Sequence, residues 1–191
     1  MEKTGFCAEE LDKCVYKCTR NNMILFVWMH VDDGVIFSNN QEEIMKLKHE
    51  LIQHLRIKWE DGLSRIVGID TTFKHNAIQL SQSRFAKQIV HHFEKKTNSP
   101  LIKTRTILPD VKLQTSTDQP VEQKWYQSLI GSLNSLALGT RLDISFAVNY
   151  LARYSNSPQQ QHWVSLCHLM RYIKYSMNWS LNYFLTNESL N

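Results

Sequence analysis

Two aspartates stand side by side in the stretch MILFVWMHVDDGVIFSNN, residues 23–40, with apolar residues before and after them. Adjacent carboxylates repel each other, and the repulsion grows where apolar neighbours keep water away. A hard divalent cation such as Mg²⁺ takes oxygen ligands and neutralises such a pair. Two metal ions held about 4 Å apart activate an attacking hydroxyl and stabilise a leaving oxygen in phosphoryl and nucleotidyl transfer. Asp32 and Asp33 are therefore candidate metal ligands and candidate catalytic residues.

A simpler interpretation of the same residues is a turn. Asp-Asp-Gly is a common turn sequence, and Asp33–Gly34 predicts a tight hairpin whose positive φ angles fall on that pair. Taken alone, the tripeptide favours this interpretation. The flanking residues favour a rigid, buried hairpin, because strands this apolar are typical of sheets covered on both faces.

The elements that must hold this hairpin follow from the hydrophobic periodicity. Strands are predicted at 14–18, 23–31, 34–38, 64–73, 77–81 and 179–185, and helices at 41–56, 82–94, 121–138, 141–155 and 158–176. We expect Asn40 with Glu43, Thr140 with Asp143, and Ser157 before Pro158 to cap three of the helices at their N-termini. Gly139 is expected to end another. This order of elements predicts an α+β fold.

The C-terminal helices and a polar segment define the expected domains. Nine apolar residues recur at helical spacing and are predicted core positions: Trp125, Leu129, Leu133, Ile144, Val148, Leu151, Trp163, Leu166 and Met170. Residues 95–120 are polar and carry three of the chain's four prolines, which is typical of a linker. The predicted division is therefore 1–94, a linker at 95–120, and 121–191.

Composition narrows the class of protein. The chain has 191 residues, of which 42% are hydrophobic and 21% charged, which is typical of a globular protein. The net charge of +4 permits a polyanionic partner without requiring one. The four cysteines form no C-x-x-C pair, so free thiols are expected. The longest apolar run, residues 23–29, is too short to span a bilayer, and no signal peptide follows Met1, so we expect an intracellular, soluble protein.

Several segments together carry a family resemblance. HVDDGVIFS resembles the Tyr-x-Asp-Asp box of reverse transcriptases. GFCAEELDKCVY precedes it, IVGID and IQLSQSRFAKQIVHHF follow, and then comes YQSLIGSLNSLALGTRLDISFAVNYLARYSNSPQQQHWVSLCHLMRYIKY. In this order and spacing the segments resemble the polyprotein of copia-type retrotransposons, from Lys3 to about Tyr183.

The resemblance implies a role for each candidate residue. Asp32 and Asp33 match the box aspartates, which bind two Mg²⁺ on a hairpin of the polymerase palm, and His30 matches the tyrosine beside the primer end. Residues 1–94 correspond to a partial palm and the start of the thumb, and 121–191 to the helical connection region. Arg84 and Lys87, on the predicted helix 82–94, are expected to meet phosphates of an RNA or DNA primer–template. A solvated helix face is the alternative for these two residues.

The resemblance also implies missing parts. The family takes a third aspartate from a strand far upstream, whereas the only carboxylates before Asp32 are Glu2, Glu9, Glu10 and Asp12, in a segment that matches a different part of the family. The family's RNase H domain would begin where this chain stops. We therefore expect a fragment that is inactive alone and exposes a strand edge and an apolar face. The missing half of the palm or a second copy of the chain would pair there.

Two alternatives stay open beside a polymerase fragment. One is a nucleic-acid-binding or interaction module without catalysis, supported by the basic side of helix 82–94. The other is a remnant with no biochemical function. Lys13 and Leu142 stand where the family has proline, and Tyr175 stands where it has glycine, which is typical of a decaying element.

Overall fold

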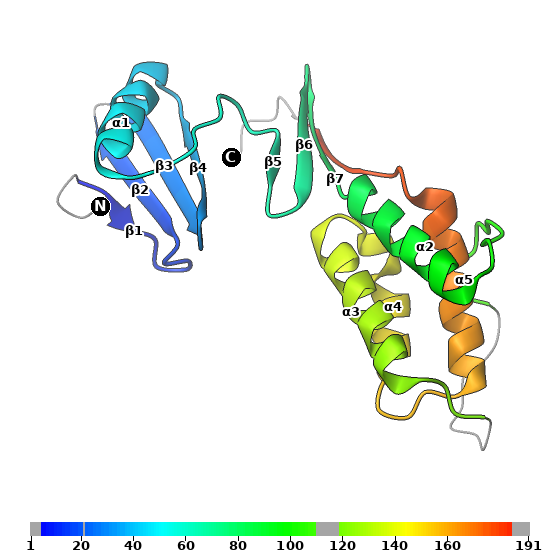
Figure 1. Ribbon diagram of the computed structural model, residues 1–191. Coiled ribbons are helices and arrows are strands. Elements are labelled where there is room, and N and C mark those ends of the chain that lie inside the picture. The colour runs from blue at the N-terminus through cyan, green and yellow to red at the C-terminus, as the bar shows by residue number, and fades with distance from the viewer. Residues whose placement is uncertain (1–4, 21, 110–118, 185–191) are drawn as a thin grey trace. The chain divides into compact units, whose positions relative to one another are not determined.

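A computed structural model describes residues 5–20, 22–109 and 119–184 of the chain. Packing divides the chain into two compact units, Met1–Val67 and Gly68–Asn191, which we describe separately. The chain forms two antiparallel four-stranded sheets, in the orders β1-β2-β3-β4 and β5-β6-β7-β8, together with helices (Figure 1). This mixture confirms the predicted α+β fold.

In the first unit, a single helix covers one face of a sheet. The strands are β1 (Cys7–Ala8), β2 (Val15–Arg20), β3 (Met23–His30) and β4 (Asp33–Ser38), and the helix is α1 (Gln41–His54) (Figure 1). Successive side chains of a strand point to opposite faces, so Leu25 and Val27 lie on the same side of β3. Both are only 3% exposed and pack with Leu47 of α1.

The other face of this sheet is open, so the expectation that these strands are buried on both faces is wrong. Phe26 pairs across the sheet with Lys17 and Phe37. Phe37 is 52% exposed and Ile24 40% exposed. The Lys17 side chain lies over the Phe26 ring, 5.6 Å from its centroid, but among the described residues of this unit no helix covers this face. The apolar strand sequence therefore reflects one buried face and one uncovered apolar face.

The start of α1 follows the sequence prediction in part. Asn40 is the N-cap, and its side chain accepts a hydrogen bond from the backbone N–H of Glu42 at 2.9 Å. The reciprocal half of the predicted capping box is wrong, because Glu43 forms an ion pair with Lys46 at 2.6 Å instead.

The second unit combines a sheet with packed helices. Its strands are β6 (Ile69–Lys74), β7 (Ala77–Ser81) and β8 (Leu181–Phe184), and β5 (Arg65–Ile66) precedes them in the same sheet. Its helices are α2 (Ser83–Thr97), α3 (Gln123–Gly139), α4 (Ser145–Ala152) and α5 (Gln160–Ser176), and the 3₁₀ turn η2 (Leu142–Ile144) comes directly before α4 (Figure 1). Strand β8 pairs antiparallel with β7, opposing Leu181 to Leu80. The last described strand therefore returns to a hairpin about a hundred residues earlier in the chain.

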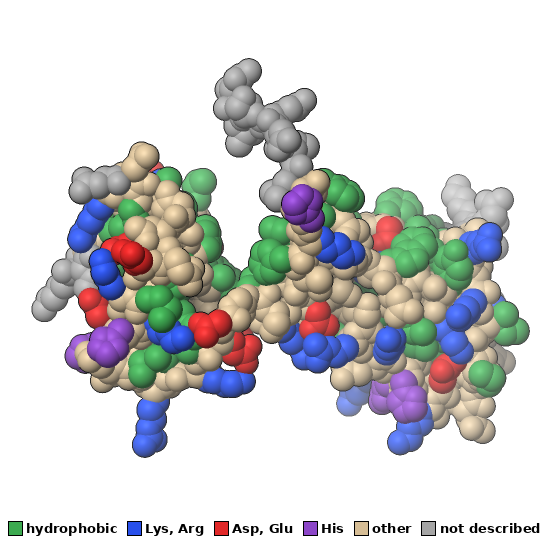
Figure 2. Space-filling view, turned by 90° about the horizontal axis from the view of Figure 1, so that it is seen from above, with side chains coloured by type: hydrophobic (Ala, Val, Ile, Leu, Met, Phe, Trp, Pro, Cys, Tyr) green, Lys and Arg blue, Asp and Glu red, His purple; other side chains and the backbone are tan. Residues whose placement is uncertain are grey.

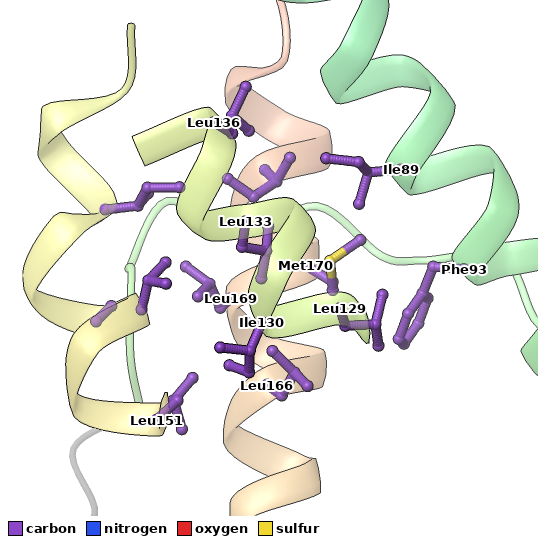
Figure 3. Packing of buried hydrophobic residues seen from close by; sticks show 14 of the residues in the cluster. Ile89, Phe93, Leu129, Ile130, Leu133, Leu136, Leu151, Leu166, Leu169 and Met170 are labelled. Atoms are coloured by element: carbon purple, nitrogen blue, oxygen red, sulfur yellow. The ribbon is translucent and has the colours of Figure 1, made fainter. Parts of the chain in front are cut away.

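The helices enclose the main hydrophobic core (Figure 3). Side chains from α2, α3, α4 and α5 meet there, among them Ile89, Leu133, Leu151 and Met170. All nine predicted core residues belong to this cluster, with Trp163 partly buried. The helical periodicity of the sequence therefore predicted this core correctly.

Two predicted helix starts differ from the structure. The predicted helix 141–155 begins as η2, where Asp143 binds Arg141 at 2.8 Å and does not form a box with Thr140. Helix α5 begins at Gln160, and Gln159 with His162 forms its capping box, so Ser157 and Pro158 lie outside it.

Gly139 is the last residue of α3 and packs against another element. Its φ angle is not positive, and Thr140 is the C-cap. A side chain at position 139 would overlap the buried side chain of Gln82, the residue just before α2. Glycine at this position therefore leaves room for the Gln82 side chain, whose Oε1 accepts a hydrogen bond from the Thr140 hydroxyl at 3.1 Å.

The segment after α2 is irregular but packed. Leu101, Ile107 and Leu108 lie against the helical core, while residues 110–118 of the predicted linker lie outside the described residues. The packing division after Val67 falls at a different place from the predicted domain boundaries. The assignment of 1–94 and 121–191 to polymerase subdomains stays a prediction.

Candidate active site

The hairpin that carries the two aspartates has a two-residue turn. Strands β3 and β4 pair from Leu25–Ser38 to His30–Asp33, which leaves Val31 and Asp32 in the turn. The predicted Asp33–Gly34 turn is wrong, because Gly34 lies within β4 opposite Met29. The observed register puts Phe26 against Phe37 with ring centroids 5.0 Å apart, and such cross-strand contacts outweigh local turn preference.

The turn stores backbone strain. Val31 has a φ angle of +53° and is 86% exposed. A β-branched residue in this region is a conformational outlier, and the strain costs about 1–3 kcal/mol. The pairing of the two strands therefore imposes this conformation and fixes the position of Asp32.

Three predicted site residues meet at the tip of this hairpin. Asp32 and Asp33 are both exposed, and Asp33 is the cross-strand partner of His30. The His30 ring stacks on Trp28 with centroids 5.6 Å apart and planes 11° apart. His30 and Asp33 lie on the open face of the sheet, because their register matches that of Phe26 and Phe37. The roles of the three residues in metal or primer binding stay a prediction.

The upstream carboxylates that the structure describes do not complete a metal centre. Asp12 belongs to a turn before β2, where its Oδ1 accepts a hydrogen bond from the backbone N–H of Cys14 at 2.8 Å. Glu2 lies outside the described residues. Within residues 5–20, 22–109 and 119–184, no group of three or more His, Cys, Asp and Glu side chains is arranged to hold a metal ion.

The two predicted phosphate contacts lie in the second unit, on α2. Lys87 is exposed. Arg84 has a 65% exposed side chain and binds both carboxylate oxygens of Asp70, at 3.1 and 2.7 Å. His91 and His92 are exposed on the same helix, and His92 lines a hollow of about 190 Å³ between α2 and α3. The structure therefore leaves Lys87 available, whereas Arg84 has a carboxylate partner.

Sequence reasoning missed three residues of these sites. Trp28 supports His30, and the i, i+2 spacing on a predicted strand was a signal for that contact. Asp70 holds Arg84 across fourteen positions, which no local pattern indicates. The positive φ angle of Val31 depends on the strand register, so the neighbouring Asp-Asp-Gly sequence gives no indication of it.

Other predicted features have simple outcomes. The four cysteines are free thiols, and burial raises the pKa of the half-buried Cys167 to about 11. Among the described residues, no helix is long and apolar enough to cross a membrane.

Two histidines of α5 take part in packing. His162 is fully buried and accepts a hydrogen bond at Nδ1 from the Gln159 backbone, and His168 contacts Thr106.

Comparison with known proteins adds to this geometry. Residues 1–107 match the family model described as reverse transcriptase (RNA-dependent DNA polymerase). The chain is 28% identical over 169 residues to the retrovirus-related Pol polyprotein from transposon RE2 of Arabidopsis thaliana, covering 88% of this chain and 12% of that protein. It is 27% identical over 174 residues to the corresponding polyprotein from transposon TNT 1-94 of Nicotiana tabacum, covering 85% and 13%.

A shorter yeast relative aligns over a larger share of its own length. The putative transposon Ty5-1 protein of Saccharomyces cerevisiae is 23% identical over 188 residues, covering 96% of this chain and 59% of that protein. The chain thus spans about one eighth of the plant polyproteins. No solved structure gives a significant match. The family match, the Asp-Asp hairpin and these relatives agree, and the chain belongs to the reverse transcriptase family of copia-type retrotransposons.

Proposed function

We propose that this chain supplies the carboxylate hairpin of an RNA-directed DNA polymerase, with Asp32 and Asp33 as metal ligands in nucleotidyl transfer. The observation that carries the proposal is the pair of exposed, adjacent carboxylates at the tip of a strained two-residue hairpin. The family match supports the reaction class. Ligands on paired strands are held more rigidly than ligands on loops.

The carboxylates of Asp32 and Asp33 are ligands of the type that Mg²⁺ prefers, but they supply only part of a two-metal site. Two carboxylates are hard oxygen donors, and Mg²⁺ sites commonly combine one or two carboxylates with substrate phosphates and water. No larger group of candidate ligands occurs among the described residues. When bound, Mg²⁺ activates the attacking hydroxyl and stabilises the leaving oxygen.

The other residues of the hairpin have positioning roles in this proposal. The turn at Val31 fixes Asp32, and strand pairing fixes Asp33. His30 lies opposite Asp33 and stacks on Trp28, and in this proposal its imidazole ring would lie beside the primer end.

A primer–template is the proposed partner of the second unit. Residues 68–191 contain 13 Lys and Arg against 7 Asp and Glu, whereas residues 1–67 contain 9 against 11. Many blue basic side chains are visible on the surface of the second unit in Figure 2. Lys87 would contact a phosphate directly, and Arg84 would do so by exchanging Asp70 for the phosphate.

The first unit would also take a protein partner. Strand β4 is an edge of its sheet in the described residues, and Phe37 leaves an apolar side chain exposed on it. An unpaired edge beside an uncovered apolar face accepts another strand or sheet. We propose that an upstream palm segment or a second copy pairs there.

A metal titration tests the hairpin. Wild-type protein and the variant Asp32→Asn/Asp33→Asn would be titrated with Mn²⁺ and followed by its electron spin resonance signal. We expect weak binding that the variant loses. The matched control is Glu42→Gln/Glu43→Gln, which removes another adjacent carboxylate pair, at the start of α1. Equal binding by all three proteins would contradict the proposal.

A primer-extension assay tests the expected inactivity of the isolated chain. No extension is expected with Mg²⁺ or Mn²⁺, because two carboxylates form a partial ligand set. Extension that Asp32→Asn/Asp33→Asn abolishes would instead mean that this chain or its second copy completes the site.

A nucleic-acid-binding module without catalysis is the second candidate, favoured by the basic charge of residues 68–191. It predicts duplex binding in EDTA that Asp32→Asn/Asp33→Asn does not alter. A remnant without biochemical function predicts neither metal binding nor duplex binding.

A further inference from the structure

Residues 99–109 form an irregular segment that packs along α5. Leu101, Ile107 and Leu108 lie against the helical core. The backbone N–H of Thr104 donates to the carbonyl of Arg171 at 3.5 Å, and the Thr106 hydroxyl contacts His168 Nε2 at 2.8 Å. The segment is thus held at both ends and in the middle, with α5 as its support.

This anchoring turns the basic residues of the segment outward. Lys103 and Arg105 alternate with the two threonines and are exposed, as is Arg171 on α5. Residues 168, 171 and 175 share one face of that helix, because they are three or four positions apart. The guanidinium of Arg105 lies over the ring of Tyr175, 5.8 Å from its centroid.

We call Lys103, Arg105, His168 and Arg171 the basic strip. Its charge is not neutralised within the described residues. Neither residues 99–109 nor α5 contains an Asp or Glu. Two carboxylates that contact these elements already have partners: Glu94 of α2 binds Lys174 at 2.6 Å and accepts the backbone N–H of Leu101 at 2.7 Å, and Asp143 accepts a hydrogen bond from Tyr172 and binds Arg141. No ion pair of Lys103, Arg105 or Arg171 occurs among the described residues.

We propose that the basic strip binds the phosphate backbone of a nucleic acid. Guanidinium groups bind phosphate oxygens with two parallel hydrogen bonds, whereas the hydroxyls of Thr104 and Thr106 are engaged with each other and with His168. Tyr175 is 37% exposed under Arg105, an aromatic and arginine combination that also stacks on bases. The strip lies on other elements than Arg84 and Lys87, so it is a second contact surface.

The inference rests on the proposed function only in that nucleic acid is the ligand, and it requires neither metal nor catalysis. The test is binding of a fluorescent DNA duplex, followed by anisotropy in EDTA from about 50 to 200 mM salt. Lys103→Gln/Arg105→Gln/Arg171→Gln is expected to lower the slope of log Kd against log salt by about 2 to 3, since each lost phosphate contact removes about 0.9.

The control removes three equal charges elsewhere. Lys46, Lys48 and Lys58 each bind a carboxylate in the first unit, so Lys46→Gln/Lys48→Gln/Lys58→Gln is expected to leave the slope unchanged. Arg105→Lys/Arg171→Lys keeps the charge but lacks the paired hydrogen bonds of a guanidinium, so it is expected to keep the salt slope and to lose part of the affinity. A salt slope lowered as much as in the triple Gln variant would assign the effect to packing and overturn the proposal.

Three further outcomes are decisive. Equal slopes for the strip variant and the control would overturn the proposal and leave the metal titration of the hairpin unaffected. Equal competition by polyglutamate at the same charge would assign the strip to an acidic protein and overturn it as well. A lowered slope in the strip variant alone, measured in EDTA, would support it, because this binding requires no metal.

Discussion

His30 and Asp33 form the last cross-strand pair before the turn that holds Asp32. Different parts of the backbone therefore hold the two neighbouring carboxylates in place. Asp33 is held by the pairing of the strands, and Asp32 is held by a turn whose first residue is strained. A change in the turn is expected to act on one carboxylate more than on the other.

The first prediction concerns Val31. Val31→Asn is expected to stabilise the hairpin by about 1 kcal/mol, because asparagine tolerates positive φ better than a β-branched residue does. Hydrogen exchange of the β3 and β4 amides measures the effect. Val67→Asn is the matched variant, since Val67 also has a positive φ, of 46°, and should slow exchange near β5 and β6 only. Faster exchange in β3 and β4 would show that the valine side chain stabilises the turn.

The second prediction compares two glycines of α3. Gly139→Ala is expected to lower the free energy of unfolding by about 1–3 kcal/mol, because its methyl group overlaps Gln82. Gly131→Ala has open space around it and should raise stability by about 1 kcal/mol through helix propensity. Urea unfolding measures both. Adding Gln82→Ala to Gly139→Ala should recover part of the loss, and full additivity would contradict the overlap.

The third prediction follows from the ion pair between buried Arg141 and Asp143, whose side chain is 32% exposed. Arg141 is 3% exposed and donates to both Asp143 oxygens and to the Ser176 carbonyl, and Tyr172 donates to Asp143 at 2.7 Å. Burial alone would raise the pKa of Asp143, but the hydrogen bonds from Arg141 and Tyr172 outweigh it and hold the pKa below its ordinary value of 3.8. The folded state therefore favours the ionised carboxylate.

Because the folded pKa is the lower one, this stabilisation is present above pH 3.8 and is lost as the pH falls through the folded pKa. Asp143→Asn is expected to cost about 1–3 kcal/mol near pH 7, and its difference from wild type should shrink below pH 4. Urea unfolding across pH measures this difference. Glu94, whose pKa is lowered chiefly by its hydrogen bond to Lys174, is present in both proteins. Its titration therefore changes both stabilities equally and does not affect the difference between them. A constant difference across pH would contradict the prediction.

The fourth prediction concerns self-association of the first unit. The wild-type chain is expected to self-associate through the β4 edge and the open face. Phe37→Lys should shift sedimentation velocity profiles toward monomer, because it places a charge beside that edge. Phe146→Lys replaces an equally apolar, 77% exposed residue on α4 and should have little effect. A monodisperse wild-type monomer would contradict this prediction.

Local patterns predicted most elements and the helical core, and long-range contacts account for what they missed. Leu133 and Met170 lie in the core because helical spacing brings apolar residues to one face, which the sequence displays directly. The position of the turn at Val31 follows from the pairing of Phe26 with Phe37, and the need for a small residue at Gly139 follows from its contact with Gln82. Neither could be predicted from neighbouring residues in the sequence. The Asp32–Asp33 pair was recognisable because its chemistry resides in neighbouring residues, whereas the basic strip needs two distant segments to meet.

The pairing of β8 with β7 has a consequence for the order in which the chain folds. Gln79 in the hairpin contacts Ser180 just before β8, a separation of 101 positions. Strands β6 and β7 can pair through a short turn, as β2, β3 and β4 do, but β8 can join them only after residues 181–184 have been synthesised. During synthesis the aspartate hairpin would mature first, and the edge of β7 would stay open to wrong partners until residue 184 arrives.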